Sequence, residues 1–394
     1  MRSFVVARRG RLSNGAFAGL GLAAALTLGA AAIAWFGWSS SLAGYDPALH
    51  YPARADVIVL QSPPQEPRDA TPVGNLAATL AGYAEVAGAH AVVPGAVPAA
   101  EREALTDALD ELFGTPFAPT VPESAAVGEL SMSPGQLAAG SQVYRRLCNQ
   151  CHGLTGSGQG NAGEWMHPFP RDFRLGQFKI AAHGARPTPA EIRRVLREGV
   201  PGTRMQAYDL VSEADLDAVT AYVVHLSQRG ETELRVLVGL DAEEGTDAGE
   251  VAGLARTAAA KSAADWQAAA AVPKSPPVTL PTGEDALRRG HDLFARNCLS
   301  CHAGYGHTES YRYDAWGVSA RVTDLTRGEW KWGREPADAV ARVRNGIPAA
   351  NMPSNPTLTD AEVLDLAAFS KALSRPDLLP ADVRQAVYPA AGAK

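Results

Sequence analysis

The residues best suited to chemistry in this chain are its four cysteines, which all fall within two copies of one pentapeptide. The copies read Cys148-Asn149-Gln150-Cys151-His152 and Cys298-Leu299-Ser300-Cys301-His302. In a C-x-x-C-H sequence the two thiols form thioethers with the vinyl groups of haem, and the adjacent imidazole becomes the proximal iron ligand. A zinc site would need further cysteine or histidine ligands at finger-like spacing, and a redox-active dithiol would not need the trailing histidine twice. The pattern therefore predicts two covalently attached haem c groups.

The sixth position of each iron requires a donor on a loop that is long enough to cross the haem face. Of the five methionines, Met205 and Met352 lie 53 and 50 residues after the histidines of their motifs, and each ends a Gly-x-Pro-x-x-x-Met sequence. A thioether ligand raises the reduction potential relative to a second imidazole. One methionine alone could equally be core filler, but matched positions in a repeat favour a ligand role. We therefore predict His152 and Met205 on one iron, and His302 and Met352 on the other.

Two other groups of side chains are weaker candidates for contact with haem. Four histidines could supply a second imidazole, but none has a partner at the equivalent position of the other copy, so surface or hydrogen-bonding roles are favoured. These are His167, His183, His225 and His307. Five further side chains could meet haem propionates, although a solvated face is the favoured interpretation for each. These are Arg174, Lys179, Arg204, Lys331 and Trp332.

The similarity between the two copies extends to the helices around them, which indicates a duplicated structural unit. Gly140 and Gly290 each lie eight residues before the first cysteine, and Tyr144 and Phe294 each lie four residues before it. A glycine allows a second helix to approach closely, and an aromatic side chain one turn from the cysteine packs on the same face. We expect the second helix to be the last one of each unit. The residues expected at the crossing are Tyr222 and Phe369.

Each unit is predicted to be all-α, since neither shows a convincing alternating strand pattern. The predicted order is an N-terminal helix, the haem motif, loops, a short helix, the methionine loop and a C-terminal helix. The short helices are expected at residues 189–198 and 336–345, and the C-terminal helices at 215–227 and 361–373. Asp172 and Asp324 recur in register and are expected to cap a turn, with no catalytic role.

Composition divides the chain outside the two units. Residues 45–132 are rich in alanine and proline, contain no cysteine and are expected to form one helix near residues 101–113. Residues 241–271 are predicted to be partly helical, and residues 272–281 contain four prolines. The predicted organisation is a membrane anchor at 1–44, a spacer or docking segment at 45–132, a first haem domain at 133–235, a linker at 236–283, a second haem domain at 284–376 and a tail at 377–394.

The N-terminus is predicted to anchor the protein in a membrane. A mainly apolar run at residues 16–38 would span about 34 Å as a helix, which is enough to cross a bilayer once. Arginines precede this run and the first acidic residue, Asp46, follows it, so a single-pass protein of the inner membrane with a periplasmic body is expected. A signal peptide cleaved near residues 41–43 is the alternative, but the run exceeds a usual signal-peptide core. The net charge of −6 argues against a nucleic acid partner.

Residues from about 132 to 229 and from 284 to 375 resemble class I cytochrome c domains in tandem, a family of small all-α bundles around one haem. A narrower resemblance is carried by His167-Pro168-Phe169-Pro170-Arg171-Asp172-Phe173-Arg174 with Phe178-Lys179, and by His225-Leu226-Ser227-Gln228-Arg229-Gly230-Glu231. These segments resemble membrane-anchored dihaem cytochrome c subunits associated with cbb(3)-type and related haem-copper oxidases. The resemblance implies that electrons come from a quinol-oxidising complex or small carrier and pass to the oxidase core, without a small-molecule substrate.

One feature of class I domains has no clear counterpart in this sequence. Such domains usually orient the proximal imidazole with the carbonyl of a proline about a dozen residues after the histidine. The resemblance implies Pro168 or Pro170 for this role in the first unit, and it leaves no candidate after His302 in the second.

Two other functions are compatible with two haem motifs. The protein could accept electrons from a periplasmic dehydrogenase, which the identity of the catalytic partner would reveal. It could also be a dihaem peroxidase, which needs one iron with an open or releasable sixth position and nearby acid and base groups. The two matched methionine loops argue against the peroxidase, so electron transfer without catalytic residues is the main hypothesis.

Overall fold

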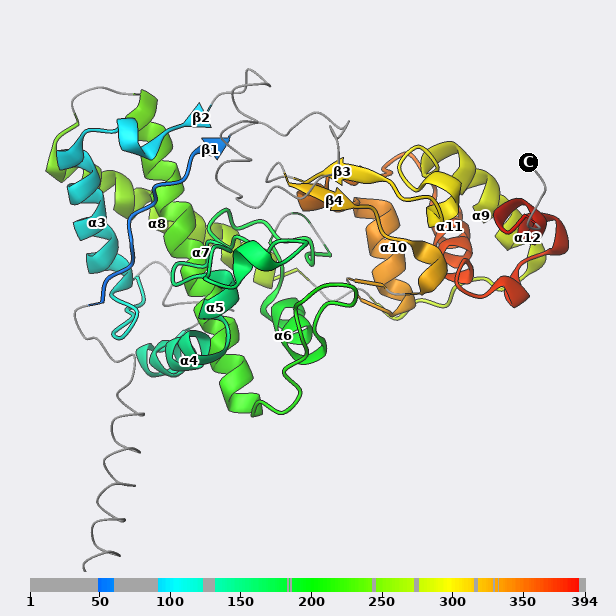
Figure 1. Cartoon of the computed structure of the whole chain (residues 1–394), viewed down its shortest axis with the longest axis horizontal. Helices are drawn as coiled ribbons and strands as arrows, with labels where there is room; N and C mark the ends of the chain where they lie inside the picture. The colour runs from blue at the N-terminus through cyan, green and yellow to red at the C-terminus, as the bar shows by residue number, and fades with distance from the viewer. Residues whose placement is uncertain are drawn as a thin grey trace, which may run out of the picture. The chain divides into compact units, whose positions relative to one another are not determined.

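The computed structural model describes residues 49–59, 91–122, 132–182, 184, 186–242, 246–272, 276–314, 318–328, 330–331 and 333–389. These residues are mostly helical, as predicted, and all but Leu49 lie in one structural unit that spans His50–Lys394 (Figure 1). The expected membrane anchor at 1–44 lies outside the described residues. Within the described ranges, no helix has the length and apolar character needed to cross a membrane.

The first haem unit is built on four helices. They are α4 (Pro134–Leu147), α5 (Asn149–His152), α6 (Pro189–Glu198) and α7 (Glu213–Ala242). Local signals set where they begin: the side chain of Ser133 caps α4, and Thr188 forms a capping box with Glu191 at the start of α6. The prediction for α6 is confirmed. The prediction for α7 was too short, because this helix continues 15 residues beyond Ser227.

The crossing of α4 and α7 depends on Gly140. A Cβ atom added at this residue would lie 2.1 Å from the carbonyl oxygen of Ala218, so only glycine permits the observed approach. Tyr222 is fully buried beside this contact, with its ring centre 5.3 Å from that of Tyr144. The predicted packing of the terminal helices is confirmed in this unit.

The second haem unit repeats this arrangement with α9 (Glu284–Asn297), α10 (Pro336–Asn345) and α11 (Asp360–Ala372), and α12 (Ala381–Val387) follows. A Cβ atom at Gly290 would lie 2.3 Å from the carbonyl oxygen of Asp365, and the rings of Phe294 and Phe369 are 5.5 Å apart. The unit also contains an antiparallel hairpin of β3 (Tyr311–Tyr313) and β4 (Ser319–Arg321). Three-residue strands are too short for a detectable alternation, which explains why the hairpin was not predicted.

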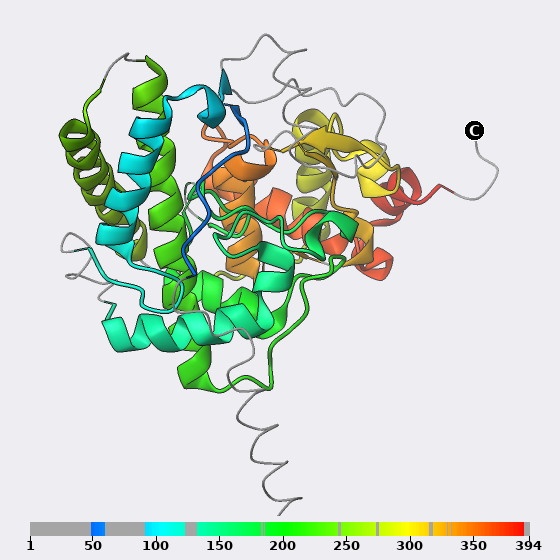
Figure 2. The same ribbon diagram turned by 60° about the vertical axis from the view of Figure 1, so that its left-hand side comes forward.

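A third hydrophobic core involves the segments on both sides of the first haem unit. The antiparallel strands β1 (Ile58–Val59) and β2 (Ala91–Val92) precede α3 (Ala99–Phe113), which packs with α8 (Ala248–Ala270) and the extended part of α7 (Figures 1 and 2). Buried residues of this core include Leu109, Phe113, Val236, Leu240 and Val251. The predicted spacer and linker segments therefore both contribute helices to a packed core.

Candidate functional site

The first C-x-x-C-H motif forms one helical turn at the end of α4. The amide of Cys148 donates to the carbonyl of Tyr144 at 2.8 Å, and the amides of Cys151 and His152 donate to the carbonyl of Cys148 at 3.1 and 2.9 Å. The second motif repeats this pattern: Cys298 with Phe294 at 2.8 Å, and Cys301 and His302 with Cys298 at 3.1 and 2.8 Å. None of the four cysteines forms a disulfide. Each motif thus holds two thiols and an imidazole on one short turn.

Both motif histidines are oriented by a backbone carbonyl. Nδ1 of His152 lies 3.1 Å from the carbonyl oxygen of Arg171, and Nδ1 of His302 lies 3.3 Å from that of Thr323. A carbonyl can only accept, so each Nδ1 carries the proton and each Nε2 keeps a lone pair for a metal. Burial lowers the pKa of His152 to about 4, which keeps the imidazole neutral. Both imidazole rings therefore have the same orientation of the proton and leave Nε2 free to bind a metal.

The expectation that Pro168 or Pro170 orients His152 was wrong. The carbonyl belongs to Arg171, and the second unit has an equivalent at Thr323 although it lacks a suitable proline. The imidazole is oriented by any backbone carbonyl that lies within hydrogen-bond distance of Nδ1. A turn that begins at the next residue can hold the carbonyl there without a proline.

The turn that follows each carbonyl is capped by an aspartate, as predicted. Oδ1 of Asp172 accepts from the amide of Arg174 at 2.9 Å, and Oδ1 of Asp324 accepts from the amide of Thr326 at 3.0 Å. Such a bond to the backbone two residues onward defines an Asx turn. Because these aspartates directly follow the residues whose carbonyls face the histidines, we assign them a positioning role.

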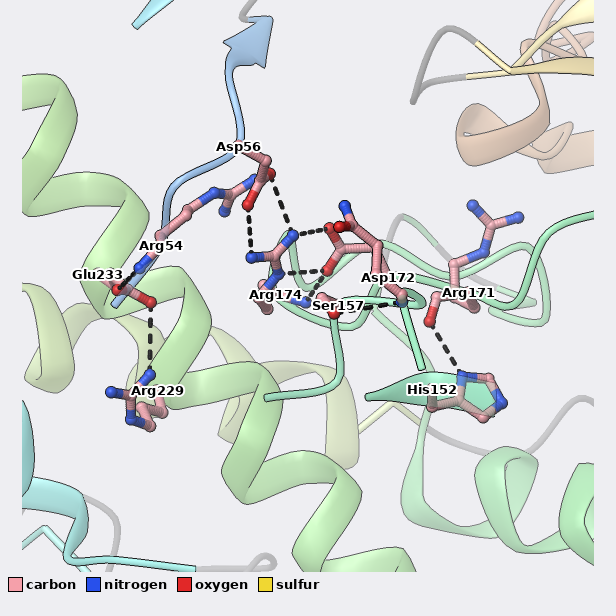
Figure 3. A network of polar contacts seen from close by, with 10 residues as sticks. Arg54, Asp56, His152, Ser157, Arg171, Asp172, Arg174, Arg229 and Glu233 are labelled. Carbon is pink, nitrogen blue, oxygen red and sulfur yellow. Dashed lines mark hydrogen bonds and ion pairs between the residues drawn. The ribbon is translucent and has the colours of Figure 1, made fainter. Parts of the chain in front are cut away.

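Buried charges fix the loop that follows the first motif (Figure 3). Nε and Nη2 of Arg174 donate to the carboxylate of Asp172 at 2.9 and 2.7 Å. Nη1 and Nη2 of Arg174 also donate to the two oxygens of Asp56, at 2.7 and 3.1 Å. Burial raises the pKa of Asp56, but the charges of Arg54 and Arg174 lower it below its ordinary value overall. A residue 118 positions earlier in the chain is therefore ionised and bound to the haem-site loop.

The segment that carries Asp56 lies along α7. The hydroxyl groups of Tyr51 and Tyr222 are hydrogen-bonded at 2.7 Å, and the Arg229 guanidinium lies 4.6 Å from the Tyr51 ring centre. Gly230 allows Arg174 to approach the same helix, because a Cβ atom there would lie 2.4 Å from the Cβ of Arg174. Sequence reasoning missed these contacts because no spacing rule links the N-terminal segment to the loop. The glycine inside a long helix was the one available signal.

The solvated positions expected for Arg174 and Lys179 were wrong. Arg174 is 4% exposed and fully occupied by Asp56 and Asp172, while the Lys179 side chain is 10% exposed and pairs with Asp314 at 2.9 Å. Both positive charges are therefore paired with carboxylates of the protein and are largely shielded from solvent. Of the other three candidates, Arg204 is exposed, Lys331 is partly buried and Trp332 lies outside the described residues.

The two methionine loops have the same backbone design. The amide of Val200 donates to the carbonyl of Met205 at 2.9 Å, and the amide of Ile347 donates to the carbonyl of Met352 at 3.0 Å. Each loop starts at a glycine with positive φ, +68° at residue 199 and +67° at residue 346. Both methionine side chains are partly buried. Their role as iron ligands stays a prediction.

The alternative histidines have other contacts. His225 is fully buried between the rings of Phe113 and Tyr222, at 5.6 and 5.7 Å between ring centres. His307 is exposed beside Tyr388 at 4.8 Å, and His167 is exposed beside Phe169 at 6.3 Å. His183 lies outside the described residues.

The fold and the repeated motif define a c-type cytochrome with two tandem domains. The family model described as "Cytochrome C oxidase, cbb3-type, subunit III" matches residues 135–223 and 285–369, one region for each unit. The match places one cytochrome c domain over each unit, which confirms the resemblance to tandem cytochrome c domains found in the sequence. Cytochrome c domains hold haem c covalently and use it for electron transfer.

No curated protein matches the chain. Among solved structures, a chain of the reducing HAO-like protein complex from Kuenenia stuttgartiensis is similar, with 24% sequence identity and a TM-score of 0.45. The similarity covers 60% of this chain and 95% of that chain.

The residues present fit haem c. Each site offers two cysteines without a disulfide and a neutral imidazole whose Nδ1 is already bound, which leaves Nε2 for iron. Each domain thus presents the thiols and the imidazole that would hold this group.

Proposed function

We propose that this protein is a membrane-anchored dihaem cytochrome that relays single electrons to a haem-copper terminal oxidase. The observation that carries the proposal is the repetition of one site: a C-x-x-C-H turn, a carbonyl on Nδ1 of the histidine and a methionine loop in which the methionine carbonyl accepts the equivalent backbone hydrogen bond. Haem c supplies reversible one-electron chemistry at its iron when bound.

The chain's own residues have three tasks in this function. Cys148, Cys151 and their counterparts in the second domain attach the group, and His152 and His302 provide the proximal nitrogen. Met205 and Met352 would each supply a thioether ligand to the iron, which would raise its potential. No residue makes or breaks a substrate bond, so no catalytic residue is assigned.

The membrane location rests on the N-terminal sequence. Residues 1–44 hold an apolar run with arginines on one side only, which favours a single span with the haem domains on the periplasmic side. This placement brings the domains to the membrane surface where a quinol-oxidising complex or small carrier delivers electrons.

The proposed acceptor is the core of a haem-copper oxidase. Support comes from the family description of both domains and from the N-terminal anchor, which would keep the cytochrome beside a membrane enzyme. An electron-transfer partner of a periplasmic dehydrogenase is the second candidate, since the same sites would serve it equally well. A peroxidase is less well supported, because both domains have the same methionine loop.

The test is to solubilise native membranes gently, isolate the protein by a C-terminal tag and identify the proteins that accompany it. A haem assay on the same sample should give two covalent haems per chain. Recovery with a haem-copper oxidase core supports the proposal. Recovery with a dehydrogenase contradicts the oxidase assignment, and extraction without detergent contradicts the anchor.

A further inference from the structure

The loop that orients His152 also binds the second haem domain. In the first domain, Arg171 carries the carbonyl on His152, and the loop continues through Lys179. Nζ of Lys179 lies 2.9 Å from Oδ2 of Asp314, and Nη2 of Arg171 lies 3.8 Å from the same atom. Asp314 directly follows β3 and is 3% exposed. A buried carboxylate of one domain is thus neutralised by two cations of the other.

A second set of contacts comes from the end of α10. Nη2 of Arg342 donates to the carbonyl of Ile180 at 2.7 Å, Nη1 of Arg342 donates to the carbonyl of Ala181, and Nδ2 of Asn345 donates to the carbonyl of Ala182 at 2.9 Å. Arg342 is 6% exposed. Three consecutive loop carbonyls of the first domain therefore find their donors in the second domain, where water has little access.

An apolar contact joins the same two regions. Phe169 and Leu175 of the first domain pack against Val318 and the fully buried Ala349 of the second. Ala349 lies three residues before Met352, so this contact reaches the methionine loop itself. A neighbouring bond, from Nδ2 of Asn351 to the carbonyl of Tyr313 at 2.8 Å, ties the methionine loop to the strand before Asp314.

We infer that this interface, defined by residues 169–182 of the first domain and by Asp314, Val318 and residues 342–349 of the second, is the junction for electron transfer between the two haem sites. It links the loop on the His152 side of one site to the loop on the Met352 side of the other. The step moves one electron: one site is oxidised, the other is reduced, and no bond is made or broken. The electron is supplied by the reduced donor of the proposed function, on which this inference rests.

The polar contacts determine how the junction should behave. Exposed charge pairs are screened by salt, whereas buried pairs and buried hydrogen bonds are screened much less. Breaking one partner of a buried pair is costly because the remaining charge stays desolvated. The junction should therefore hold the domains in a fixed relation without a docking step, and transfer between the sites should not depend on ionic strength.

The test uses the full-length, haem-loaded protein and two arginines of one helix. Arg342→Gln removes the donor to the loop carbonyls of the first domain. Arg344→Gln is the matched control, because among the described residues the hydrogen-bond partners of Arg344 all lie in the second domain: Asp360 at 2.5 Å, the carbonyl of Asn355 at 3.3 Å and the carbonyl of Leu358. Lys179→Met is a second junction variant in the other domain, in case Arg342→Gln fails to fold.

Two readouts separate this inference from the proposed function. In calorimetry, which does not depend on redox activity, the parent and Arg344→Gln should unfold with both domains in one transition, and the junction variants should show two. In rapid photoreduction, electron equilibration between haems should be independent of salt in the parent and slower by roughly tenfold in the junction variants. Junction variants that match Arg344→Gln in both readouts would overturn the inference. An oxidase that fails to co-purify would overturn the proposed acceptor and leave the junction intact.

Discussion

The carbonyl oxygen of Arg171 lies 3.1 Å from Nδ1 of His152. The second domain repeats this relationship at Thr323 and His302, and an aspartate that caps a turn follows each carbonyl residue. The two sites therefore share a positioning device that depends on backbone geometry and one carboxylate. This device gives a direct way to alter each haem site separately.

Replacing the second of these aspartates should change one reduction potential. Asp324→Ala removes the acceptor for the amide of Thr326, so the carbonyl on His302 should shift. When Nδ1 of His302 donates a hydrogen bond to that carbonyl, the imidazole becomes a stronger electron donor to the iron. Loss of this bond should therefore raise the reduction potential of this haem by on the order of tens of mV. Redox titration monitored by absorbance measures the change. Asp382→Ala, in an exposed pair with Arg288, is the control. Equal potentials in both variants would refute the positioning role.

Removing Asp56 should destabilise the first domain. Asp56→Ala leaves the buried Arg174 guanidinium with one carboxylate partner in place of two, and breaking a buried pair costs about 3–5 kcal/mol when nothing replaces it. Because Asp172 remains, we expect a loss of about 2–3 kcal/mol of unfolding free energy, measured with denaturant. The control Asp377→Ala breaks an exposed pair with Arg375 and should cost much less, because solvent screens that pair. Similar losses in the two variants would show that the buried network contributes little.

Glycine at the start of the second methionine loop should be required for methionine ligation. A Cβ atom at Gly346 would lie 2.3 Å from the carbonyl oxygen of Met352, and φ of +67° is strained for other residues by roughly 1–3 kcal/mol. Gly346→Ala should displace the loop and reduce the population of Met352-ligated iron, seen in the oxidised absorption spectrum. Gly253→Ala is the control, because this helical glycine has no atom within 4 Å of an added Cβ and should be stabilised slightly. A normal spectrum in Gly346→Ala would argue against Met352 as a ligand.

His225 should make the protein sensitive to acid. Burial, and to a smaller extent the charge of Arg229, lower its pKa to about 3 against a smaller opposing effect of the Phe113 backbone. Between about pH 6.5 and 3 the unfolded chain therefore binds a proton that the folded chain does not, so the unfolding free energy falls as the pH falls. From pH 7 to pH 5 this one group should remove about 2 kcal/mol.

The variant His225→Phe isolates this effect. It keeps an aromatic ring between Phe113 and Tyr222 and should lose that part of the pH dependence in denaturant unfolding. The exposed position His307→Phe serves as the control and should keep the parental slope. An unchanged slope in His225→Phe would contradict the buried, neutral histidine.

The sequence predicted the parts of this structure that local signals encode. The bounds of α6 and α10 were predicted correctly because each helix begins with a capping residue and proline and ends before a glycine. The close crossings at Gly140 and Gly290 followed from the repeat. Helix ends and helix crossings of this kind depend on residues that are close in the sequence, so they can be predicted from one sequence.

Contacts between distant segments could not be predicted in this way. The bond from Arg174 to Asp56 joins residues 118 positions apart, and the bonds from Arg342 join residues more than 160 positions apart. The acceptor of the His152 proton is a backbone carbonyl, which any residue type can provide. Because these contacts join distant residues, only the folded structure showed that the N-terminal segment contacts the loop of the first haem site.

In the proposed function, both haems are ligated by histidine and methionine and carry electrons only. Electron paramagnetic resonance of the oxidised, full-length protein, recorded for the parent and for Met205→Ala and Met352→Ala, tests it most directly. Two low-spin ferric signals are expected in the parent, with a different one lost in each variant. A high-spin signal in the parent, or a variant spectrum identical to that of the parent, would contradict it.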